Sequence, residues 1–389
     1  MQTTFEQKPH VGICAVPLEG GKSGIGVYII KIIRHLSKRD DMRLTVFGFE
    51  SERHLLEIGP GVNFVRIPEM FSGLAAGLFW HAGILPLLAL RNRLDVLFLP
   101  AGNRRMSLRP PFASYRLLST VHDLAQFHLP QKYDRLRILY VTEVLPAMWK
   151  SADGLIAVSH ATKRDLIEKT ACEEAKISVV WNGVEHENFR IIPGEEARRV
   201  LRERGFLPEN FILYVSRIEH PGKNHVGLLK AYALLRERRP DLKQHLLFCG
   251  SDWSGSEAVH AEIVRLGLRE YVHTTGFIEQ NLLPYYYCAA DLMAFPSLFE
   301  GFGIPLIEAM AAGLPVVSSN RASLPEVLGN VGLTFNPEDA SEMSAALEKG
   351  LFDENFRRMA ATCGPVRAGE FSWKRSADET ADVLLGILR

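Results

Sequence analysis

The 389-residue sequence is poor in cysteine: it has five, and no two of them form a CxxC pair. Scattered cysteines argue against a zinc site or a disulfide framework and indicate a reducing, cytoplasmic setting. The formal net charge is zero, without the strong basic excess typical of nucleic-acid-binding proteins. Residues 1–10 lack the apolar stretch of a secretory signal. We therefore expect a cytoplasmic protein with no nucleic-acid partner.

Two common phosphate-binding motifs are also missing. Gly21-Lys22-Ser23 resembles the end of a P-loop, but Val16 stands where the first glycine of that motif is required. The early glycines fall at positions 20, 21, 24 and 26, and this spacing does not match GxGxxG. Both departures count against a kinase and against a dinucleotide-dependent oxidoreductase.

One long uncharged run has to be weighed as a membrane span. Residues 71–90 carry no formal charge and are followed by Arg91 and Arg93. The length of this uncharged run is the minimum for a helix that spans a membrane. His81, Pro86 and three glycines favour a buried or interface-lying helix instead. If the segment lies on a membrane, the arginines up to position 109 can meet anionic headgroups.

Apolar runs alternate with amphipathic stretches along the whole chain. A polar, charge-rich segment at 185–210 separates two series of runs. The first series is 11–16, 44–49, 63–67, 95–100, 117–123, 154–159 and 177–184, and the second is 211–217, 245–250, 272–277, 291–297, 315–319 and 332–335. Strand–helix alternation of this kind predicts parallel sheets covered on both faces. We expect an α/β protein with two Rossmann-like, doubly wound domains, 1–188 and 189–370, and a final helix at about 371–389.

Two features of the first domain follow predicted strands. The segment 20–26, GGKSGIG, comes after the first strand and opens a helix. Glycines let the backbone approach a ligand, and a helix N-terminus favours negative charge, although a plain tight turn explains the same residues. His122 ends another strand, where open α/β sheets place ligand groups; a purely structural histidine is the alternative.

Two cations follow the first strand of the second domain. Arg217 and Lys223 stand six residues apart on a loop that contains Pro221 and Gly222. Guanidinium and ammonium groups at the carboxyl end of a strand can converge on a diphosphate. Solvated surface cations are the alternative interpretation.

The segment 299–310 carries the most information. A strand ends at 296–297, and Pro305 suits the first turn of a helix that Gly313 would close. The backbone N–H groups of Gly303 and Ile304 would then form an anion cradle at the positive helix end.

Two carboxylates flank this cradle. Glu300 precedes the helix on its loop, and Glu308 lies one turn into the helix. Carboxylates accept hydrogen bonds only and suit vicinal diols, so both can hold the hydroxyls of a ligand whose phosphates lie at the helix start. Two solvated glutamates are a poor explanation because the flanking sequence is strongly apolar.

At these residues the sequence resembles the nucleotide-sugar glycosyltransferases of family 4, which have the GT-B fold. Glu300 to Glu308 reproduces the EX7E motif of that family. The resemblance covers nearly the whole chain, because it extends to the segments 20–26, 158–166, 181–184, 216–224 and 324–329.

The resemblance implies roles for residues that face a sugar-nucleotide donor. Arg217 and Lys223 would neutralise the diphosphate and the charge that develops as it leaves. Glu308 would hold the ribose hydroxyls and Glu300 the hydroxyls of the donor sugar. The backbone of the loop and helix start would face the sugar and phosphates through Gly301, Phe302, Gly303 and Ile304.

Further implied roles lie in the first domain. Gly21 and Gly24 would face the phosphates or the acceptor, and His122 would lie near the transferred sugar. The catalytic set implied is therefore Glu300, His122, Arg217 and Lys223. The helix at 371–389 would cross back to the first domain. Transfer would retain the anomeric configuration with no obligatory metal and no other cofactor, because two cations and a helix end replace a divalent ion.

We therefore expect a hexosyltransferase of cell-surface polysaccharide, lipopolysaccharide or glycolipid assembly. The first choice of donor is GDP-mannose, and the alternatives are UDP-glucose or a UDP-N-acetylhexosamine. The acceptor would be a saccharide or a lipid-linked saccharide, reached by peripheral contact with the cytoplasmic membrane face. A GT-B phosphorylase and a non-catalytic sugar-nucleotide binder are the other readings.

Overall fold

The computed structural model describes residues 8–130, 138–205 and 208–389. The chain divides into two compact units: unit 1 comprises Met1–Asn182 and Trp373–Arg389, and unit 2 comprises Gly183–Ser372. The boundaries expected after residues 188 and 370 differ from these because residues 183–188 pair with the returning chain. Val184 forms an isolated bridge with Ser372, and the imidazole Nε2 of His186 donates to the carbonyl of Phe371 at 3.0 Å.

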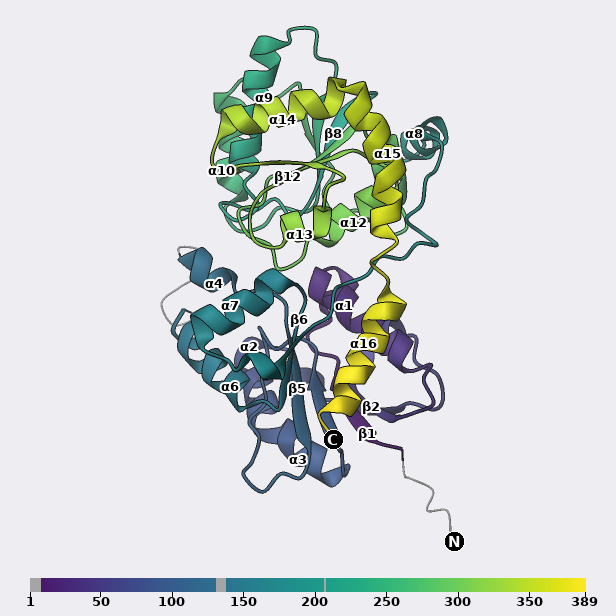
Figure 1. Ribbon diagram of the computed structural model, residues 1–389, viewed down its shortest axis with the longest axis vertical. Coiled ribbons are helices and arrows are strands. Elements are labelled where there is room, and N and C mark those ends of the chain that lie inside the picture. The colour runs from purple at the N-terminus through teal and green to yellow at the C-terminus, as the bar shows by residue number, and fades with distance from the viewer. Residues whose placement is uncertain (1–7, 131–137, 206–207) are drawn as a thin grey trace. The chain divides into compact units, whose positions relative to one another are not determined.

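Unit 1 contains a parallel sheet of seven strands in the order β3-β2-β1-β4-β5-β6-β7 (Figure 1). Each of the seven runs predicted for this unit overlaps one of these strands. Their bounds are β1 His10–Cys14, β2 Arg43–Phe49, β3 Asn63–Ile67, β4 Val96–Leu99, β5 Arg116–Val121, β6 Gly154–Ala157 and β7 Ile177–Val179. Every residue of β4 and β6 is buried, as expected for strands covered on both faces.

Helices cover this sheet. On one face the C-terminal helix α16 (Trp373–Gly386) packs against α1 (Gly24–Leu36), where the rings of Tyr28 and Trp373 meet edge to face at 6.2 Å. Trp80 and Trp149 enter a large apolar core cluster of the unit. The other helices are α2 Leu74–Phe79, α3 Leu85–Arg91, α4 Ala125–His128, α6 Leu145–Ser151 and α7 His160–Thr170.

Two helical segments of unit 1 contain a π-helical turn immediately before a proline. One is η4 (Trp80–Ile84), which precedes Pro86 in α3, and the other is η6 (Tyr140–Val144), which precedes Pro146 in α6. A proline lacks the N–H that would bond the preceding turn, and its ring clashes with that turn's carbonyl. The wider turn accommodates both effects while the helix continues.

The uncharged run identified in the sequence forms one of these segments. Leu74–Arg91 is 18 residues long with a mean hydropathy of 1.5, so within the described residues it alone meets the length and composition of a membrane-crossing helix. About a third of it, 33%, is buried in unit 1. Trp80, Leu85 and Ala89 belong to the apolar core, so its inner side packs as a core helix does.

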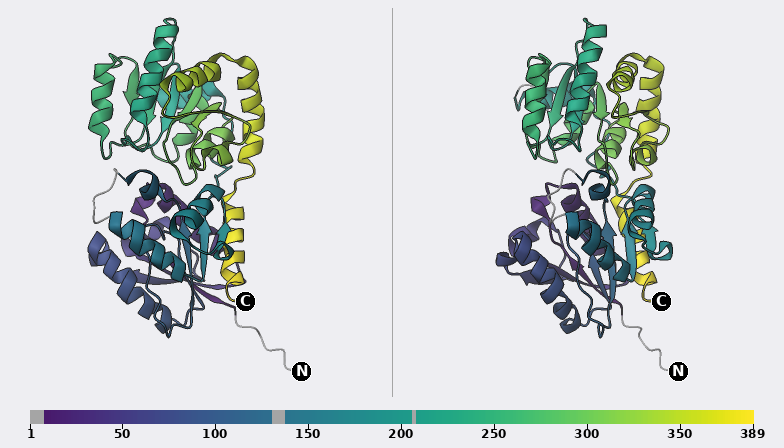
Figure 2. Two further views of the ribbon diagram at one scale, coloured as in Figure 1. Left: turned by 60° about the vertical axis from the view of Figure 1, so that its left-hand side comes forward. Right: turned by 90° about the vertical axis from the view of Figure 1, so that its left-hand side faces the viewer.

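Unit 2 has a parallel sheet of six strands in the order β10-β9-β8-β11-β12-β13. The strands are β8 Phe211–Val215, β9 His245–Cys249, β10 Val272–Thr274, β11 Leu292–Phe295, β12 Val316–Ser319 and β13 Leu333–Phe335. One group of contacting helices consists of α9 His225–Arg238, α10 Ser256–Arg265 and α14 Ala340–Phe352. A second consists of α8 Gly194–Arg202, α11 Leu283–Ala289, α12 Ile304–Ala311, α13 Leu324–Leu328 and α15 Glu354–Ala368. Figure 2 shows helices on both faces of the sheet in each unit.

The strand order reverses once in each sheet. In unit 1 the reversal lies between β1 and β4, and in unit 2 it lies between β8 and β11. The loops that leave the carboxyl ends of such a pair run in opposite directions and open a crevice, which is where open α/β sheets bind ligands. The strand order therefore selects two pairs of loops: those after β1 and β4, and those after β8 and β11.

Candidate functional site

In unit 2 the two loops at the strand reversal are bonded to one another. The backbone N–H of Leu298, after β11, donates to the carbonyl of Gly222, after β8, at 2.9 Å. The Asn224 side-chain amide donates to the carbonyls of Pro296 at 3.1 Å and Pro337 at 2.8 Å. These bonds fix the loop that carries Lys223 beside the loop that carries Glu300.

An ion pair joins the two loops at their centre. The Lys223 ammonium lies 2.6 Å from Glu300 Oε1, and the two side chains are only 21% and 16% exposed. Tyr214 OH at the end of β8 donates to the carbonyl of Lys223 at 2.7 Å. Ser323 Oγ, ahead of α13, donates to the carbonyls of Glu300 at 2.8 Å and Phe302 at 3.1 Å. Both charged residues therefore sit on backbone that is held by hydrogen bonds.

Helix α12 begins next to this ion pair. Gly303 precedes its first residue, Ile304, with φ at 99°, a left-handed conformation that favours glycine. A Cβ on Gly303 would also lie 2.8 Å from a methyl carbon of Leu324. Pro305 occupies the first turn, and no side chain caps the helix start. Backbone N–H groups at the start of α12 thus remain for an acceptor that approaches from outside the helix.

Glu308 lies in the second turn of α12 and is buried. Its Oε2 accepts a hydrogen bond from Tyr287 OH at 2.7 Å. The pKa of Glu308 is raised to about 7, and burial is the largest cause. The charge of Glu185 contributes to this rise, and the hydrogen bond from Tyr287 opposes it. Glu308 therefore exchanges its proton near neutral pH, whereas an ordinary glutamate is fully ionised there.

Arg217 has a different set of contacts from Lys223. Its guanidinium stacks over the Trp253 ring at 4.7 Å and lies 3.6 Å from the carboxylate of Glu219, which is fully buried. Within the described parts of the chain no hydrogen bond or ion pair joins Arg217 to Lys223 or Glu300. The side chain of Arg217 is 43% exposed. Arg217 and Lys223 both follow β8. The structure therefore does not bring Arg217 and Lys223 into one set of contacts.

Two of the first-domain candidates, Gly21 and Gly24, follow β1 at the strand reversal of unit 1. Gly21, with φ at 73°, ends the short 3-10 helix η1 (Glu19–Gly21) after β1. Gly24 is the first residue of α1, and Ser23 caps that helix by accepting a hydrogen bond from the Gly26 N–H at 3.1 Å. A Cβ on Gly26 would lie 2.1 Å from the carbonyl of Leu18, so glycine is required for this close approach.

His122 follows β5 and is buried. Its Nε2 lies 2.7 Å from the carbonyl of Pro100 in the loop after β4, and its ring meets Tyr28 edge to face at 4.7 Å. A carbonyl only accepts, so Nε2 carries the proton and Nδ1 is left as an acceptor. Burial lowers the pKa of His122 to about 4, and the imidazole is neutral near pH 7.

Sequence reasoning missed the residues that hold the candidates in place. These are Asn224, Ser323, Tyr287 and Trp253. Asn224 precedes α9 in a left-handed conformation with φ at 56°, and its place directly after Lys223 in a predicted loop was the available signal. The contacts of Tyr287 and Trp253 are made across the fold, and no local pattern reveals them.

Among the residues that the structure describes, no three His, Cys, Asp or Glu side chains gather as a metal site would require. The absence of an obligatory metal stays a prediction.

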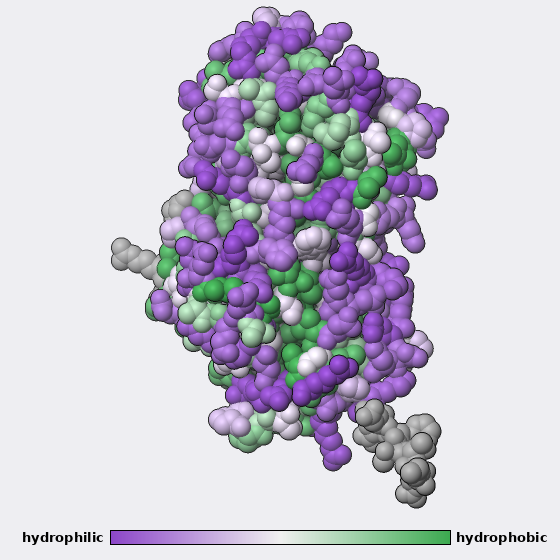
Figure 3. All heavy atoms as spheres, viewed as in Figure 1, coloured by the Kyte–Doolittle hydropathy of each residue, from purple (hydrophilic) through white to green (hydrophobic). Residues whose placement is uncertain are grey.

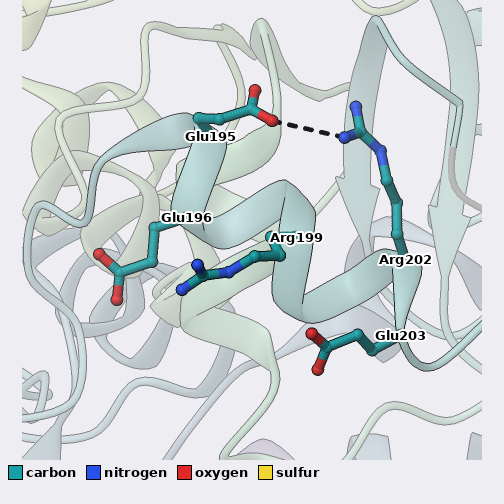
Figure 4. A pocket seen from close by; sticks show the side chains of 5 residues that line it. All are labelled: Glu195, Glu196, Arg199, Arg202 and Glu203. Atoms are coloured by element: carbon teal, nitrogen blue, oxygen red, sulfur yellow. Dashed lines mark hydrogen bonds and ion pairs between the residues drawn. The ribbon is translucent and has the colours of Figure 1, made fainter.

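An open hollow elsewhere in unit 2 is unrelated to these loops. It is lined by Glu195, Glu196, Arg199, Arg202 and Glu203, which lie on or directly after α8 (Figure 4). Arg202 pairs with Glu195 at 3.4 Å. Charged side chains from a single surface helix account for this hollow.

A parallel-sheet fold of two units, with cations and a helix start at the strand reversal of unit 2, defines the GT-B class of transferases. Comparison with known proteins agrees. The model of the family described as Glycosyltransferase Family 4 matches residues 22–188, and that described as Glycosyl transferases group 1 matches residues 198–365. O-antigen chain mannosyltransferase B of Escherichia coli is 32% identical over 273 residues, which are 69% of this chain and 70% of the relative. The chain belongs to the family 4, group 1 glycosyltransferases.

Two further similarities mark the extent of this relationship. The serotype-specific mannosyltransferase WbdA of E. coli is 30% identical over 267 residues, which cover 68% of this chain but only 32% of WbdA. The solved structure of Anabaena HepE in complex with UDP and glucose shares the fold, with a TM-score of 0.73, 20% identity and coverage of 97% of this chain and 100% of HepE. The protein is therefore a hexosyltransferase with the GT-B fold, as the sequence predicted.

Proposed function

We propose that this glycosyltransferase moves a mannosyl group from GDP-mannose to a saccharide or lipid-linked saccharide, with retention of the anomeric configuration. The observation that carries the proposal is the Lys223–Glu300 pair at 2.6 Å beside the start of α12. The choice of mannose is supported by the names of the E. coli relatives, both of which are mannosyltransferases.

The proposed chemistry follows from the charges at the strand reversal of unit 2. Transfer breaks the bond between the anomeric carbon and a diphosphate oxygen, and negative charge grows on the departing diphosphate. Lys223, Arg217 and the N–H groups at the start of α12 supply positive charge at that point. Preorganised charge of this kind lowers the barrier because it needs no rearrangement during the reaction.

Glu300 and Glu308 have separate tasks in this proposal. When the diphosphate engages Lys223, the Glu300 carboxylate is freed to accept hydrogen bonds from the hydroxyls of the donor sugar. Glu308, held by Tyr287, accepts from the ribose hydroxyls. Gly301 and Phe302 present backbone to the same ligand between the two carboxylates.

The residues of unit 1 serve the acceptor side in this proposal. The neutral His122 offers Nδ1 as an acceptor for a sugar hydroxyl, because Nε2 is engaged by Pro100. Gly21 and Gly24 let backbone approach the substrate at the start of α1. No metal or other cofactor takes part, because Lys223 and Arg217 supply the positive charge.

We also propose that unit 1 contacts an anionic membrane surface from the cytoplasm, where a lipid-linked acceptor is found. Support comes from six large apolar side chains that are exposed within residues 70–112: Met70, Leu74, Phe79, Leu87, Leu108 and Phe112. Apolar residues (green) stand among charged and polar ones (purple) on the surface drawn in Figure 3. The exposed arginines Arg91 and Arg93, at the end of α3, complement anionic headgroups.

A thermal-shift panel of UDP, GDP, ADP and their sugars tests the choice of donor. The nucleotide that binds stabilises the fold by a free energy that grows with the logarithm of its concentration over Kd. We expect the largest shift with GDP and GDP-mannose, and an α-linked product when the acceptor reaction is analysed by NMR. A larger shift with UDP, the nucleotide in the HepE complex, would move the assignment to UDP-glucose or a UDP-N-acetylhexosamine. No shift with any nucleotide would favour a phosphorylase.

Sedimentation with vesicles tests the membrane contact. Phe79→Ser and Phe112→Ser should reduce binding to vesicles that contain anionic phospholipid. Val366→Ser is the matched control, since Val366 is equally exposed but belongs to α15 of unit 2. Equal binding by all three variants, or a protein wholly soluble in cell extracts before any carbonate wash, would contradict this part of the proposal.

A further inference from the structure

The strand reversal of unit 1 holds a second group of cations that the proposed transfer does not use. The loops after β1 and β4 meet there, and an ion pair between Glu19 and Arg104 ties them together. The loop after β4 is a tight turn in which the N–H groups of Arg104 and Arg105 both donate to the carbonyl of Ala101 at 2.9 Å. The turn is anchored further by Trp149, whose indole N–H donates to the carbonyl of Gly102 at 3.0 Å.

Arg105 has no counter-ion in this turn. The one hydrogen bond of its side chain in the described structure runs from NH1 to the carbonyl of Arg104 at 3.2 Å, and no described residue accepts a hydrogen bond from its buried Nε. Glu19, whose charge acts on Arg105, is already paired with Arg104. Arg104 and Arg105 together carry two positive charges against the single negative charge of Glu19. One guanidinium charge is thus left without compensation.

Apart from Arg104 and Glu19, the groups around Arg105 are uncharged. Its Nε and NH2 pack over Gly77 of α2, where a Cβ would lie 3.5 and 3.7 Å from these atoms. The other titratable groups that face it are Cys14, His81 and Tyr140. Burial raises the pKa values of Cys14 and Tyr140 and lowers the pKa of His81 to about 4, so all three are neutral at pH 7. Leaving a half-buried cation without an anion is unfavourable in such surroundings.

A second polar atom in the same turn also lacks a partner. Asn103 Oδ1 is buried, and none of the residues that the structure describes donates a hydrogen bond to it. Buried polar atoms are nearly always bonded, so an unpaired acceptor and an unpaired cationic donor in one turn point to a ligand that satisfies both. Such a ligand offers an anionic oxygen together with a hydroxyl group, as a phosphorylated sugar does.

We propose that Arg105 and Asn103 form an acceptor subsite in unit 1 that binds a phosphate group and an adjacent hydroxyl of a phosphorylated saccharide. The guanidinium of Arg105 donates to the phosphate oxygens, a geometry for which arginine is better suited than lysine. Asn103 accepts from the sugar hydroxyl. The inference rests on the proposed function, because it assigns the acceptor of the same enzyme to a chemical class: sugars that carry a phosphate.

Titration of the full-length chain with mannose 1-phosphate tests this subsite. Saturating GDP or UDP is kept present, so that the phosphate-binding loops of unit 2 are already filled. We expect the sugar phosphate to bind, methyl mannoside to bind at least tenfold more weakly, and added salt to weaken the binding of the phosphate only. No binding of mannose 1-phosphate by the wild type, or loss of its binding once nucleotide is saturating, would overturn the proposal.

The variants assign the binding to Arg105. Arg105→Gln should weaken the binding of mannose 1-phosphate at least tenfold, and Arg105→Lys should weaken this binding less. Arg43→Gln is the matched control, because Arg43 is exposed and begins β2 at the opposite, amino-terminal edge of the same sheet. It should bind as the wild type does. Equal affinity of Arg105→Gln and Arg43→Gln would show that Arg105 does not hold the phosphate.

Two readouts separate this inference from others. Nucleotide-induced thermal shifts should be the same in the wild type and in Arg105→Gln, which shows that the variant is folded and that the donor site is intact. If nucleotides bind but Arg105→Gln does not change the affinity for mannose 1-phosphate, the acceptor inference fails and the proposed function stands. Vesicles that contain anionic phospholipid should bind Arg105→Gln as they bind the wild type. Loss of vesicle binding with unchanged mannose 1-phosphate affinity would instead assign Arg105 to a lipid headgroup and overturn the proposal.

Discussion

The Lys223 ammonium and the Glu300 carboxylate meet at 2.6 Å although 77 residues separate them in the chain. Their loops leave β8 and β11, which are neighbours in the sheet where the strand order reverses. Hydrogen bonds from Tyr214, Asn224 and Ser323 hold the backbone of the two loops that carry Lys223 and Glu300. The pair is therefore set up by the fold before any ligand arrives, and it lies beside an uncapped helix start.

Replacing Glu300 by glutamine should abolish most of the transfer while leaving the fold intact. The amide is isosteric with the carboxylate, but it carries no charge to balance Lys223 and accepts hydroxyl hydrogen bonds more weakly. We expect kcat to fall by about two orders of magnitude, the loss seen when one preorganised polar group is removed from an active site. Steady-state kinetics with the identified donor measure this. Glu279→Gln, at an exposed position of the same unit, is the control, and a Glu300→Gln enzyme with full turnover would place the site elsewhere.

Gly303→Ala should destabilise the start of α12 for two separable reasons. The new Cβ meets Leu324 at 2.8 Å, and the backbone keeps φ at 99°. The strained backbone alone costs about 1 kcal/mol or slightly more, and the steric contact adds to it. Gly267→Ala isolates the first effect, because Gly267 has φ at 67° and nothing within 4 Å of its Cβ. Urea unfolding should show a larger loss for Gly303→Ala than for Gly267→Ala, and equal losses would remove the steric argument.

Glu308 should make the protein less stable as the pH rises towards neutrality. Its pKa is raised by burial to about 7 in the fold from 4.5, so the folded state holds a proton that the unfolded state releases between these values. Stability from this group is complete below about pH 4.5 and is lost as the pH rises to about 7, by up to about 3 kcal/mol. The Glu308→Gln variant should lack this part of the pH dependence. Denaturant unfolding of both proteins from pH 5 to 8 measures the difference, and parallel curves would contradict the raised pKa.

His122→Ala should lower turnover without weakening nucleotide binding, because His122 belongs to unit 1 and the diphosphate residues belong to unit 2. The wild-type imidazole, with a pKa of about 4, stays neutral from pH 5 upward. The pH–rate profiles of wild type and variant should therefore share their shape between pH 5 and 8. A limb near pH 6.5 that disappears in His122→Ala would show that the histidine is ionised during turnover.

The strands could be predicted from the sequence, because buried parallel strands are continuous apolar runs bounded by turns. Each predicted run overlaps a strand of one of the two sheets. The division of the chain at Asn182 and Gly183 goes with the pairing of Val184 with Ser372, which is a contact between distant segments. Local patterns do not contain such contacts.

Part of the candidate site was predictable because the ends of buried strands can be recognised in the sequence. Glu300, Lys223 and the start of α12 follow strand ends, and a strand end is visible in the sequence. The approach of Lys223 to Glu300 depends on the order of β8 and β11 in the sheet, which the sequence does not display. The stacking of Arg217 on Trp253 and the bond from Tyr287 to Glu308 are likewise contacts of the folded chain.

Calorimetric titration of GDP and UDP into the wild type and Lys223→Ala tests the central claim most directly. The claim is that the crevice between the β8 and β11 loops binds a nucleoside diphosphate through Lys223 and the start of α12. The preferred nucleotide should bind Lys223→Ala at least tenfold more weakly, since a charge-assisted contact to phosphate is lost, whereas Lys230→Ala, at an exposed position of α9, should bind as the wild type does. Equal affinity of all three proteins for both nucleotides would contradict the claim.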